Sequence, residues 1–130
     1  MNDSIEVVGL GRMAYTPAYE AQVRHHAEVL AARDVVHQVD GALAGRLLTV
    51  EHDPVVTVSR RPGAAGHVLA SEAVLAERGV ELVKTDRGGD VTYLGPGQVV
   101  VYTILDLKRL RLGLHEHLRL MEDAVIEALK

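Results

Sequence analysis

Apolar residues recur along the chain at two spacings, which predict strands and helices respectively. Loose alternation from Ile5 to Leu10, with glycines at positions 9 and 11, predicts a short strand that ends in a turn. Short apolar runs predict four further strands, at Leu47–Val50, Val55–Val58, Val80–Thr85 and Val99–Leu105. Because the first two of these runs are continuous, we expect their strands to be covered on both faces.

A helical spacing of three and four residues begins at Thr16, which we expect to cap a helix whose first residue is Pro17. The residues expected on its buried face are Ala18, Ala21, Val29 and Leu30, and those expected in water are Arg24, His25, Glu28 and Arg33. No period is recognisable from residue 34 to residue 45, so this segment is predicted to be a loop.

Two further helices are predicted. Ser71 can cap a helix that runs to Glu77 and stops at Gly79. The clearest helical pattern is the last one, whose apolar residues are Leu114, Leu118, Met121, Val125 and Leu129. This pattern reaches Lys130 without a stop signal, so we expect the natural domain to continue beyond it.

Helices that precede, separate and follow strands predict the α/β (α+β) class, with a mixed β-sheet flanked by helices. The length of 130 residues suits one domain with its own core. A content of 48% hydrophobic and 25% charged residues is typical of a globular fold. We therefore expect residues 1–130 to form a single domain.

Charge and composition count against some classes of protein and exclude certain kinds of site. The formal net charge of −4 is opposite in sign to that of a general nucleic-acid binder. The absence of cysteine excludes disulfides, zinc–thiolate sites and a thiol nucleophile within these residues. The first residues lack the pattern of a signal peptide, and no apolar run reaches membrane-spanning length. We therefore expect a cytoplasmic protein without membrane contact.

The densest candidate site is the glycine-rich stretch from Arg87 to Gln98, which lies between the last two predicted strands. Its glycines let the backbone approach a ligand closely, and the guanidinium of Arg87 can hold a carboxylate or a phosphate. From composition alone an ordinary hairpin turn is the more common outcome, since Pro-Gly is a common turn dipeptide. It lacks the lysine of a P-loop, and its glycine spacing differs from that of a dinucleotide fingerprint.

Other polar groups give weaker signals. Glu51 and His52 point to opposite faces of a strand, so we expect them at a solvated strand end and not as an acid–base pair. The twin arginines Arg60 and Arg61 are expected to be exposed. A basic cluster of Lys108, Arg109 and Arg111 precedes the last helix, and it is compatible with a solvated edge or with contact to an acidic protein.

Neither a metal site, nor a serine nucleophile, nor a cofactor is expected. The pairs His25–His26 and His115–His117 lack the spacing of three or four residues that helical metal ligands need. Ser59 has no Gly-x-Ser-x-Gly elbow around it.

Three blocks of sequence, taken together, resemble the lipoyl(octanoyl) transferase family of the biotin/lipoate protein ligase superfamily. They are residues 47–57, residues 87–98 with the string Arg-Gly-Gly-x-x-Thr-Tyr-x-Gly-Pro-Gly-Gln, and residues 102–107. The resemblance covers essentially the whole chain. It implies a biotin/lipoate ligase-like sheet flanked by helices, of which this chain is the N-terminal portion, incomplete at its C-terminus.

The resemblance also implies an activity. The family transfers an octanoyl group from octanoyl-acyl carrier protein to a lysine of a lipoyl domain, in 2-oxoacid dehydrogenases or the glycine cleavage H protein. The segment that matches its substrate-binding loop consists of Arg87, Gly88, Gly89, Asp90, Val91, Thr92, Tyr93 and Leu94. In such a loop, backbone amides can stabilise the oxyanion of a thioester, and an aliphatic core can line an octanoyl tunnel. Nucleic acid and membranes are not among the implied partners.

Two departures from the family pattern matter. The family uses a cysteine nucleophile assisted by a lysine, and both lie beyond Lys130, so no catalytic residue is assigned within this chain. The family position between Tyr93 and Gly95 is normally His, and here it is Leu94. Three alternatives stay open: a truncated octanoyltransferase, a non-catalytic relative that binds a carrier or a lipoyl domain, and one half of a split enzyme. We expect the 130-residue chain alone to be inactive.

Overall fold

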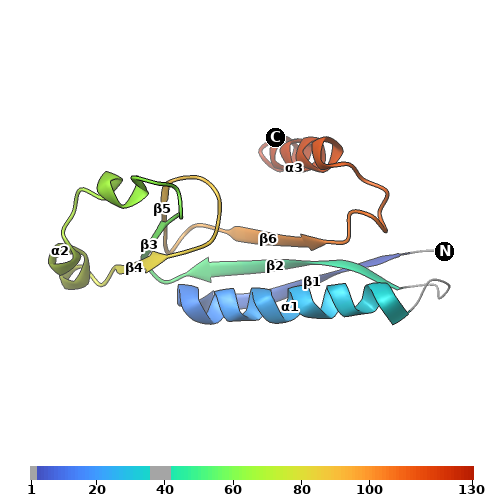
Figure 1. The fold of residues 1–130 in the computed structure, drawn as a ribbon, viewed down its shortest axis with the longest axis horizontal. Helices are drawn as coiled ribbons and strands as arrows, with labels where there is room; N and C mark the ends of the chain where they lie inside the picture. Colours follow the sequence, from blue (N-terminus) through green and yellow to red (C-terminus); the bar gives the residue numbers. More distant parts are fainter. Residues whose placement is uncertain (1–2, 36–41) are drawn as a thin grey trace. The chain divides into compact units, whose positions relative to one another are not determined.

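The computed structural model describes residues 3–35 and 42–130, in which helices are interspersed among single strands and runs of strands (Figure 1). The elements are β1 (Ser4–Met13), α1 (Tyr15–Val35), β2 (Leu43–His52), β3 (Val55–Val58), the 3-10 helix η1 (Ala64–His67), α2 (Glu72–Glu77), β4 (Glu81–Lys84), β5 (Val91–Leu94), β6 (Val100–Leu105) and α3 (Leu114–Ala128). This composition confirms the predicted α/β (α+β) class.

The strands form two three-stranded sheets, with the orders β1-β2-β6 and β4-β3-β5. In the second sheet, β3 runs parallel to β4, with Val55 opposite Glu81. It runs antiparallel to β5, with Val55 opposite Leu94. The second sheet is therefore mixed, as predicted.

The chain divides into two compact units, which we describe separately. The first comprises the described parts of residues 1–8, 23–47 and 103–130, and the second comprises residues 9–22 and 48–102. The whole β4-β3-β5 sheet and the glycine-rich stretch belong to the second unit.

The core of the second unit is built from small aliphatic side chains. Its buried apolar residues include Leu48, Val50, Val55, Val58, Ala64 and Leu75. Three of the four β3 residues are buried, which confirms the expected covering of this strand. The predicted ends of α2 are also confirmed, because the Ser71 side chain accepts from the Val74 amide and Gly79 adopts φ +68°.

The boundaries of β1 and α1 differ from the prediction. β1 does not end at the two glycines but continues to Met13, with Gly11 at φ +70°. α1 begins at Tyr15, and the Ala18 amide donates to the Ala14 carbonyl, so Pro17 lies inside the first turn and not at its start. Proline is tolerated there because the first-turn amides need no partner within the helix.

The predicted loop at 34–45 is wrong at both ends, because α1 continues to Val35 and β2 begins at Leu43. The part of this prediction that concerns residues 36–41 lies outside the described residues. On α1, Ala18, Ala21 and Val29 are buried as predicted, whereas Leu30 is 49% exposed. The strand β5 was not predicted at all, because it lies inside the glycine-rich stretch.

The last predicted helix is confirmed as α3, and none of its residues is buried. Among the described residues, no helix combines the length and the apolar character needed to cross a membrane.

Candidate functional site: the glycine-rich loop

The loop before β5 is fastened to β3 by the guanidinium group of Arg87. Its Nε donates to the hydroxyl of Thr57 at 3.0 Å, and its Nη2 donates to the carbonyls of Thr57 at 2.9 Å and Asp90 at 3.2 Å. Its Nη1 donates to the carbonyl of Gly88 at 2.6 Å. Arg87 therefore holds the loop in shape, a role that its sequence context did not reveal.

Ser59 fastens the loop from the end of β3. Its hydroxyl donates to the Gly89 carbonyl at 2.7 Å, and its amide donates to the Asp90 carbonyl at 2.9 Å. The residue is only 7% exposed. Together with Arg87, it occupies the carbonyl oxygens of Gly88, Gly89 and Asp90, so these three carbonyls are turned towards the protein.

The amide groups of the same three residues are in the opposite situation. Within the described part of the chain, the amides of Gly88, Gly89 and Asp90 donate to no acceptor. Successive backbone amides without a partner in the protein can bind an anion or an oxyanion. The loop therefore offers the donors that a thioester carbonyl needs when negative charge develops on it.

The two glycines of this loop differ in what they contribute. Gly89 has a φ of +89°, a left-handed conformation that side chains disfavour. Gly88 lacks this constraint, and a Cβ built on it meets no atom within 4 Å. The space beside Gly88 is thus open. No other atom of the protein fills it, so a ligand can approach the backbone there.

Beyond the loop, the chain enters β5 in register with β3. Thr92 lies opposite Thr57, Tyr93 opposite Val56, and Leu94 opposite the fully buried Val55. Leu94 itself is half-buried, whereas Tyr93 is 51% exposed. A side chain at position 94 can therefore reach both the protein interior and water.

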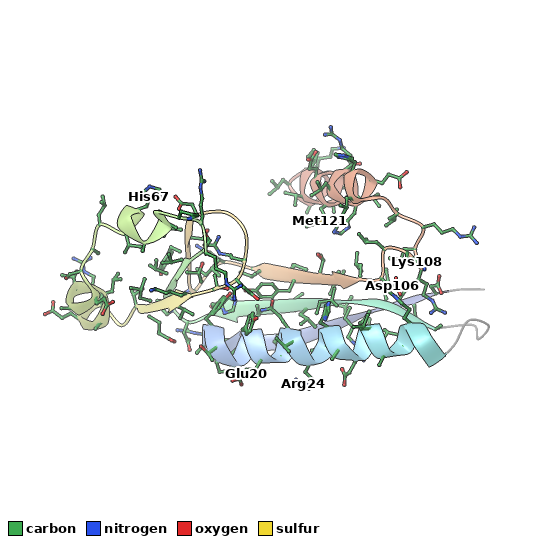
Figure 2. The ribbon with its side chains drawn as sticks, viewed as in Figure 1. Glu20, Arg24, His67, Asp106, Lys108 and Met121 are labelled. Carbon is green, nitrogen blue, oxygen red and sulfur yellow. The ribbon has the colours of Figure 1, made fainter. Side chains whose placement is uncertain are left out.

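Asp90 links the loop to η1. Its Oδ2 lies 2.5 Å from Nδ1 of His67, which is labelled in Figure 2. The other carboxylate oxygen of Asp90 is buried and has no partner among the described residues. The pair ties η1 to the loop on the side of Asp90.

A pocket of about 490 Å³ lies in the same unit, bounded by the residues just before the loop. It is lined by Tyr15 and Tyr19 of α1, by Ser59 and Arg60 after β3, and by Lys84, Thr85 and Asp86 at the end of β4. The hydroxyl of Tyr19 donates to Oδ2 of Asp86 at 2.9 Å, and this bond raises the pKa of Tyr19. The volume falls within the range of small-molecule sites.

A buried polar cluster in this unit was missed by the sequence analysis. His52 is fully buried, and its Nε2 lies 2.7 Å from the hydroxyl of Tyr102. Its ring also contacts that of Tyr15, whose hydroxyl lies 2.8 Å from the Thr85 hydroxyl. Burial lowers the pKa of His52, and burial raises the pKa of Tyr102 to about 12.

The prediction that His52 stands at a solvated strand end is therefore wrong. The side chain is buried because it has a hydrogen-bond partner, and that partner lies fifty residues away in the chain. No local pattern around Glu51 and His52 contains this information.

The other candidate residues take simpler positions. Arg60 and Arg61 are exposed as predicted, and so are Lys108 and Arg111 of the basic cluster, whereas Arg109 is half-buried in an ion pair with Asp3. Within residues 3–35 and 42–130, no group of three or more metal-ligating side chains comes together.

Comparison with known proteins provides evidence about the family that is independent of the structure. The profile of the lipoyl protein ligase A/B catalytic domain matches residues 25–130. The octanoyltransferase of Koribacter versatilis is 39% identical over 126 residues, which cover 95% of this chain and 46% of that protein. Those of Alkaliphilus metalliredigens and Acidobacterium capsulatum are 37% and 41% identical, over 96% and 94% of this chain and 53% and 48% of the relatives.

The chain thus spans about half the length of the curated relatives that it matches. The match to the family profile covers most of the chain and includes the glycine-rich loop, the pocket residues of β4 and the half-buried Tyr102. This chain belongs to the lipoyl protein ligase A/B catalytic domain family.

Proposed function

We propose that this chain carries the acyl-thioester-binding part of an octanoyltransferase, as the N-terminal portion of the family's catalytic domain. The whole enzyme transfers an octanoyl group from octanoyl-acyl carrier protein to a lysine of a lipoyl domain, in 2-oxoacid dehydrogenases or the glycine cleavage H protein. The proposal puts the chain in the cytoplasm, whose reducing conditions keep a thiol nucleophile free. Support comes from relatives named octanoyltransferase that are 37–41% identical to it.

The observation that carries the proposal is the succession of unpaired amides at Gly88, Gly89 and Asp90. Attack on a thioester places negative charge on the carbonyl oxygen, and preoriented backbone donors lower the energy of that state. Here the orientation of two of these amides is fixed in advance. The amides of Gly89 and Asp90 share peptide planes with the carbonyls of Gly88 and Gly89, which Arg87 and Ser59 hold.

The nucleophile is proposed to come from outside these 130 residues. Acyl transfer between a thioester and an amine proceeds best through a side chain that is reactive near neutral pH, and cysteine meets this need better than serine or threonine. The chain contains no cysteine and spans about half of its relatives. Its own part in the reaction is to bind the acyl group and to stabilise the charge on the thioester oxygen.

Mass spectrometry of an acceptor lipoyl domain tests this function. The chain is incubated with octanoyl-acyl carrier protein and the apo domain, alone and with the C-terminal half of the Koribacter versatilis octanoyltransferase. We expect octanoyl transfer in the mixture and none by the chain alone. Gly88→Val should abolish it, whereas Gly66→Val, where a Cβ also meets no atom within 4 Å, should not. Equal transfer by the two variants would contradict the proposed site.

A further inference from the structure

A second pocket, of about 660 Å³, lies in the first unit where the chain leaves β6, and it is rich in cations. Its charged lining residues are Arg33, Lys108, Arg109, Arg111, Asp3 and Asp106. Four cations against two carboxylates leave an excess of two positive charges, in a chain whose formal net charge is −4. Figure 2 shows Asp106 and Lys108 together at the start of the turn that follows β6.

The two carboxylates hold the turn in place. Asp106 is 3% exposed and receives Nε and Nη2 of Arg33, at 3.0 and 2.9 Å. It also accepts from the Arg109 amide at 3.1 Å, and Arg33 is the main cause that lowers the pKa of Asp106. The side chain of Arg109 is in turn paired with Asp3 at 2.8 Å. The pocket is therefore supported by charge pairs that use up both of its acidic groups.

Lys108 and Arg111 are left without such partners. Both are exposed, and neither forms an ion pair with a carboxylate in the described parts of the chain. Two cations in one pocket, with no acidic group of the protein to neutralise them, favour an anionic ligand.

The backbone of Arg111 supports the same reading. Arg111 has a φ of +56°, and it is the one non-glycine residue with positive φ among those that the structure describes. Its amide donates to the Lys108 carbonyl at 3.2 Å, so the turn imposes this conformation. Glycine would adopt it without strain, whereas a side chain is strained there. A strained position that presents a cation to a pocket points to a use for that cation.

We propose that this pocket, through Lys108 and Arg111, is the docking site for the acidic surface of the carrier protein that delivers the octanoyl group. The inference rests on the proposed function. The acceptor of that reaction presents a lysine ammonium, which the positive excess repels. The donor carries its acyl group on an arm linked through a phosphodiester, so the charge of that arm is negative. Carboxylates and phosphates are the groups that arginine and lysine bind best.

The net negative charge of the whole chain favours docking of an acidic partner at this pocket over other parts of the surface. A protein of net charge −4 repels an acidic partner over most of its surface, and a local positive excess attracts it at one place. Such complementarity sets the orientation and the rate of encounter more than the final affinity.

Binding of unacylated holo-acyl carrier protein to the 130-residue chain tests the proposal, measured by titration at low and at physiological salt. Lys108→Gln should raise the Kd by about fivefold at low salt, which is the equivalent of one charge contact at 4 Å in water. The increase should be smaller at high salt, because salt screens the charges. The matched control is Arg24→Gln, which removes one charge from the solvent-exposed part of α1 (Figure 2) and should leave the Kd unchanged.

Arg111→Gly separates docking from a purely structural role. We expect it to weaken carrier binding to a similar extent while the Tm stays equal or rises, because the left-handed position is relieved of strain. A lower Tm with unchanged carrier binding would overturn the proposal. So would absence of carrier binding, or an apo lipoyl domain that binds more tightly than the carrier and is equally weakened by Lys108→Gln.

A ligand without any carrier keeps this test separate from the proposed function. Octanoyl-pantetheine presents the acyl thioester but neither a phosphate nor a protein surface, and its binding should be the same in the wild type, Lys108→Gln and Arg111→Gly. If it binds while carrier docking ignores both variants, the docking site is wrong and the proposed function stands. If it fails to bind while carrier docking follows the charges, the proposed function is wrong and the acidic-partner site stands.

Discussion

Arg87 donates two hydrogen bonds to Thr57, one to its hydroxyl at 3.0 Å and one to its carbonyl at 2.9 Å. Thr57 is fully buried in the middle strand of the β4-β3-β5 sheet, and Arg87 begins the loop in which three successive amides have no acceptor among the described residues. The pair thus connects the best-buried strand of the unit with the group of donors that would meet a substrate. The shape of the candidate site depends on this connection.

Replacing Arg87 tests whether its hydrogen bonds hold the loop in place. Arg87→Lys keeps the positive charge but loses the planar fork that reaches Thr57, Gly88 and Asp90. We expect the free energy of unfolding, measured by urea titration, to fall by about 1–3 kcal/mol. Arg61→Lys at an exposed position is the control and should leave it unchanged. Equal stability of the two variants would mean that the guanidinium is dispensable for the loop.

Gly45 offers a second test, in the first unit. A Cβ on Gly45 would lie 2.5 Å from Cδ2 of Leu105 and 2.7 Å from the carbonyl oxygen of Ile104, so β2 and β6 would have to move apart. Gly45→Ala should therefore cost about 1–3 kcal/mol of stability by overpacking. Gly9→Ala, where the nearest atom is at 3.7 Å, is the matched variant and should be close to neutral in the same denaturation experiment.

Sequence reasoning found the elements whose signals are local. The Ser71 cap, the Gly79 stop and the apolar spacing of α3 each involve residues close together in the chain, and each is confirmed. The strand β5 was not predicted, because glycines surround it and its strand character comes from pairing with β3. The burial of His52 was not predicted for the same physical reason, since its hydrogen-bond partner Tyr102 lies on another strand.

The candidate loop was located from the sequence, but the hydrogen bonding of its carbonyl and amide groups was not predicted. The string from Arg87 to Leu94 identified the segment, whereas the division between occupied carbonyls and unpaired amides follows from the positions of Thr57 and Ser59. Those two residues lie on and just after β3, thirty residues away in the chain. Only the folded arrangement assigns Arg87 to holding the loop.

Acid should destabilise the protein through the buried His52 and the half-buried His25. Burial lowers the pKa of His52 below 6.5, so between the two pKa values the unfolded chain binds more protons than the folded one. Stability is then complete above about pH 6.5 and falls as the pH drops below it, by at most about 1.4 kcal/mol per pH unit for one group. His25 adds to the slope, since burial, and then Arg46, lower its pKa.

Comparing variants separates these contributions. In urea titrations at pH 7 and pH 5, His52→Gln should lose less stability on acidification than the wild type does, and His52→Gln combined with His25→Gln should lose least. Asp106, whose pKa the Arg33 bonds lower, acts only in more acid solution, below about pH 3.8. An unchanged acid slope in His52→Gln would show that His52 does not stay neutral in the folded protein.

The family resemblance implies a histidine at the position of Leu94, and introducing that histidine tests what the leucine costs in activity. Position 94 is half-buried at the end of β5, so an imidazole there can keep contact with water. In the mixture with the C-terminal half of the relative, Leu94→His should raise the transfer rate by adding a polar group near the developing oxyanion. A loss of about 1–3 kcal/mol of stability without a gain in rate would instead mean that the imidazole is buried unpaired.

The most direct test of the account is a titration of the ¹⁵N-labelled chain with octanoyl-pantetheine, followed by amide NMR. The central claim is that the unpaired amides of the loop receive the acyl thioester. We expect saturable shifts at Gly88, Gly89 and Asp90, their loss in Gly88→Val, and their persistence in Gly66→Val. Shifts confined to residues outside 87–94, or binding by Gly88→Val as tight as by the wild type, would contradict it.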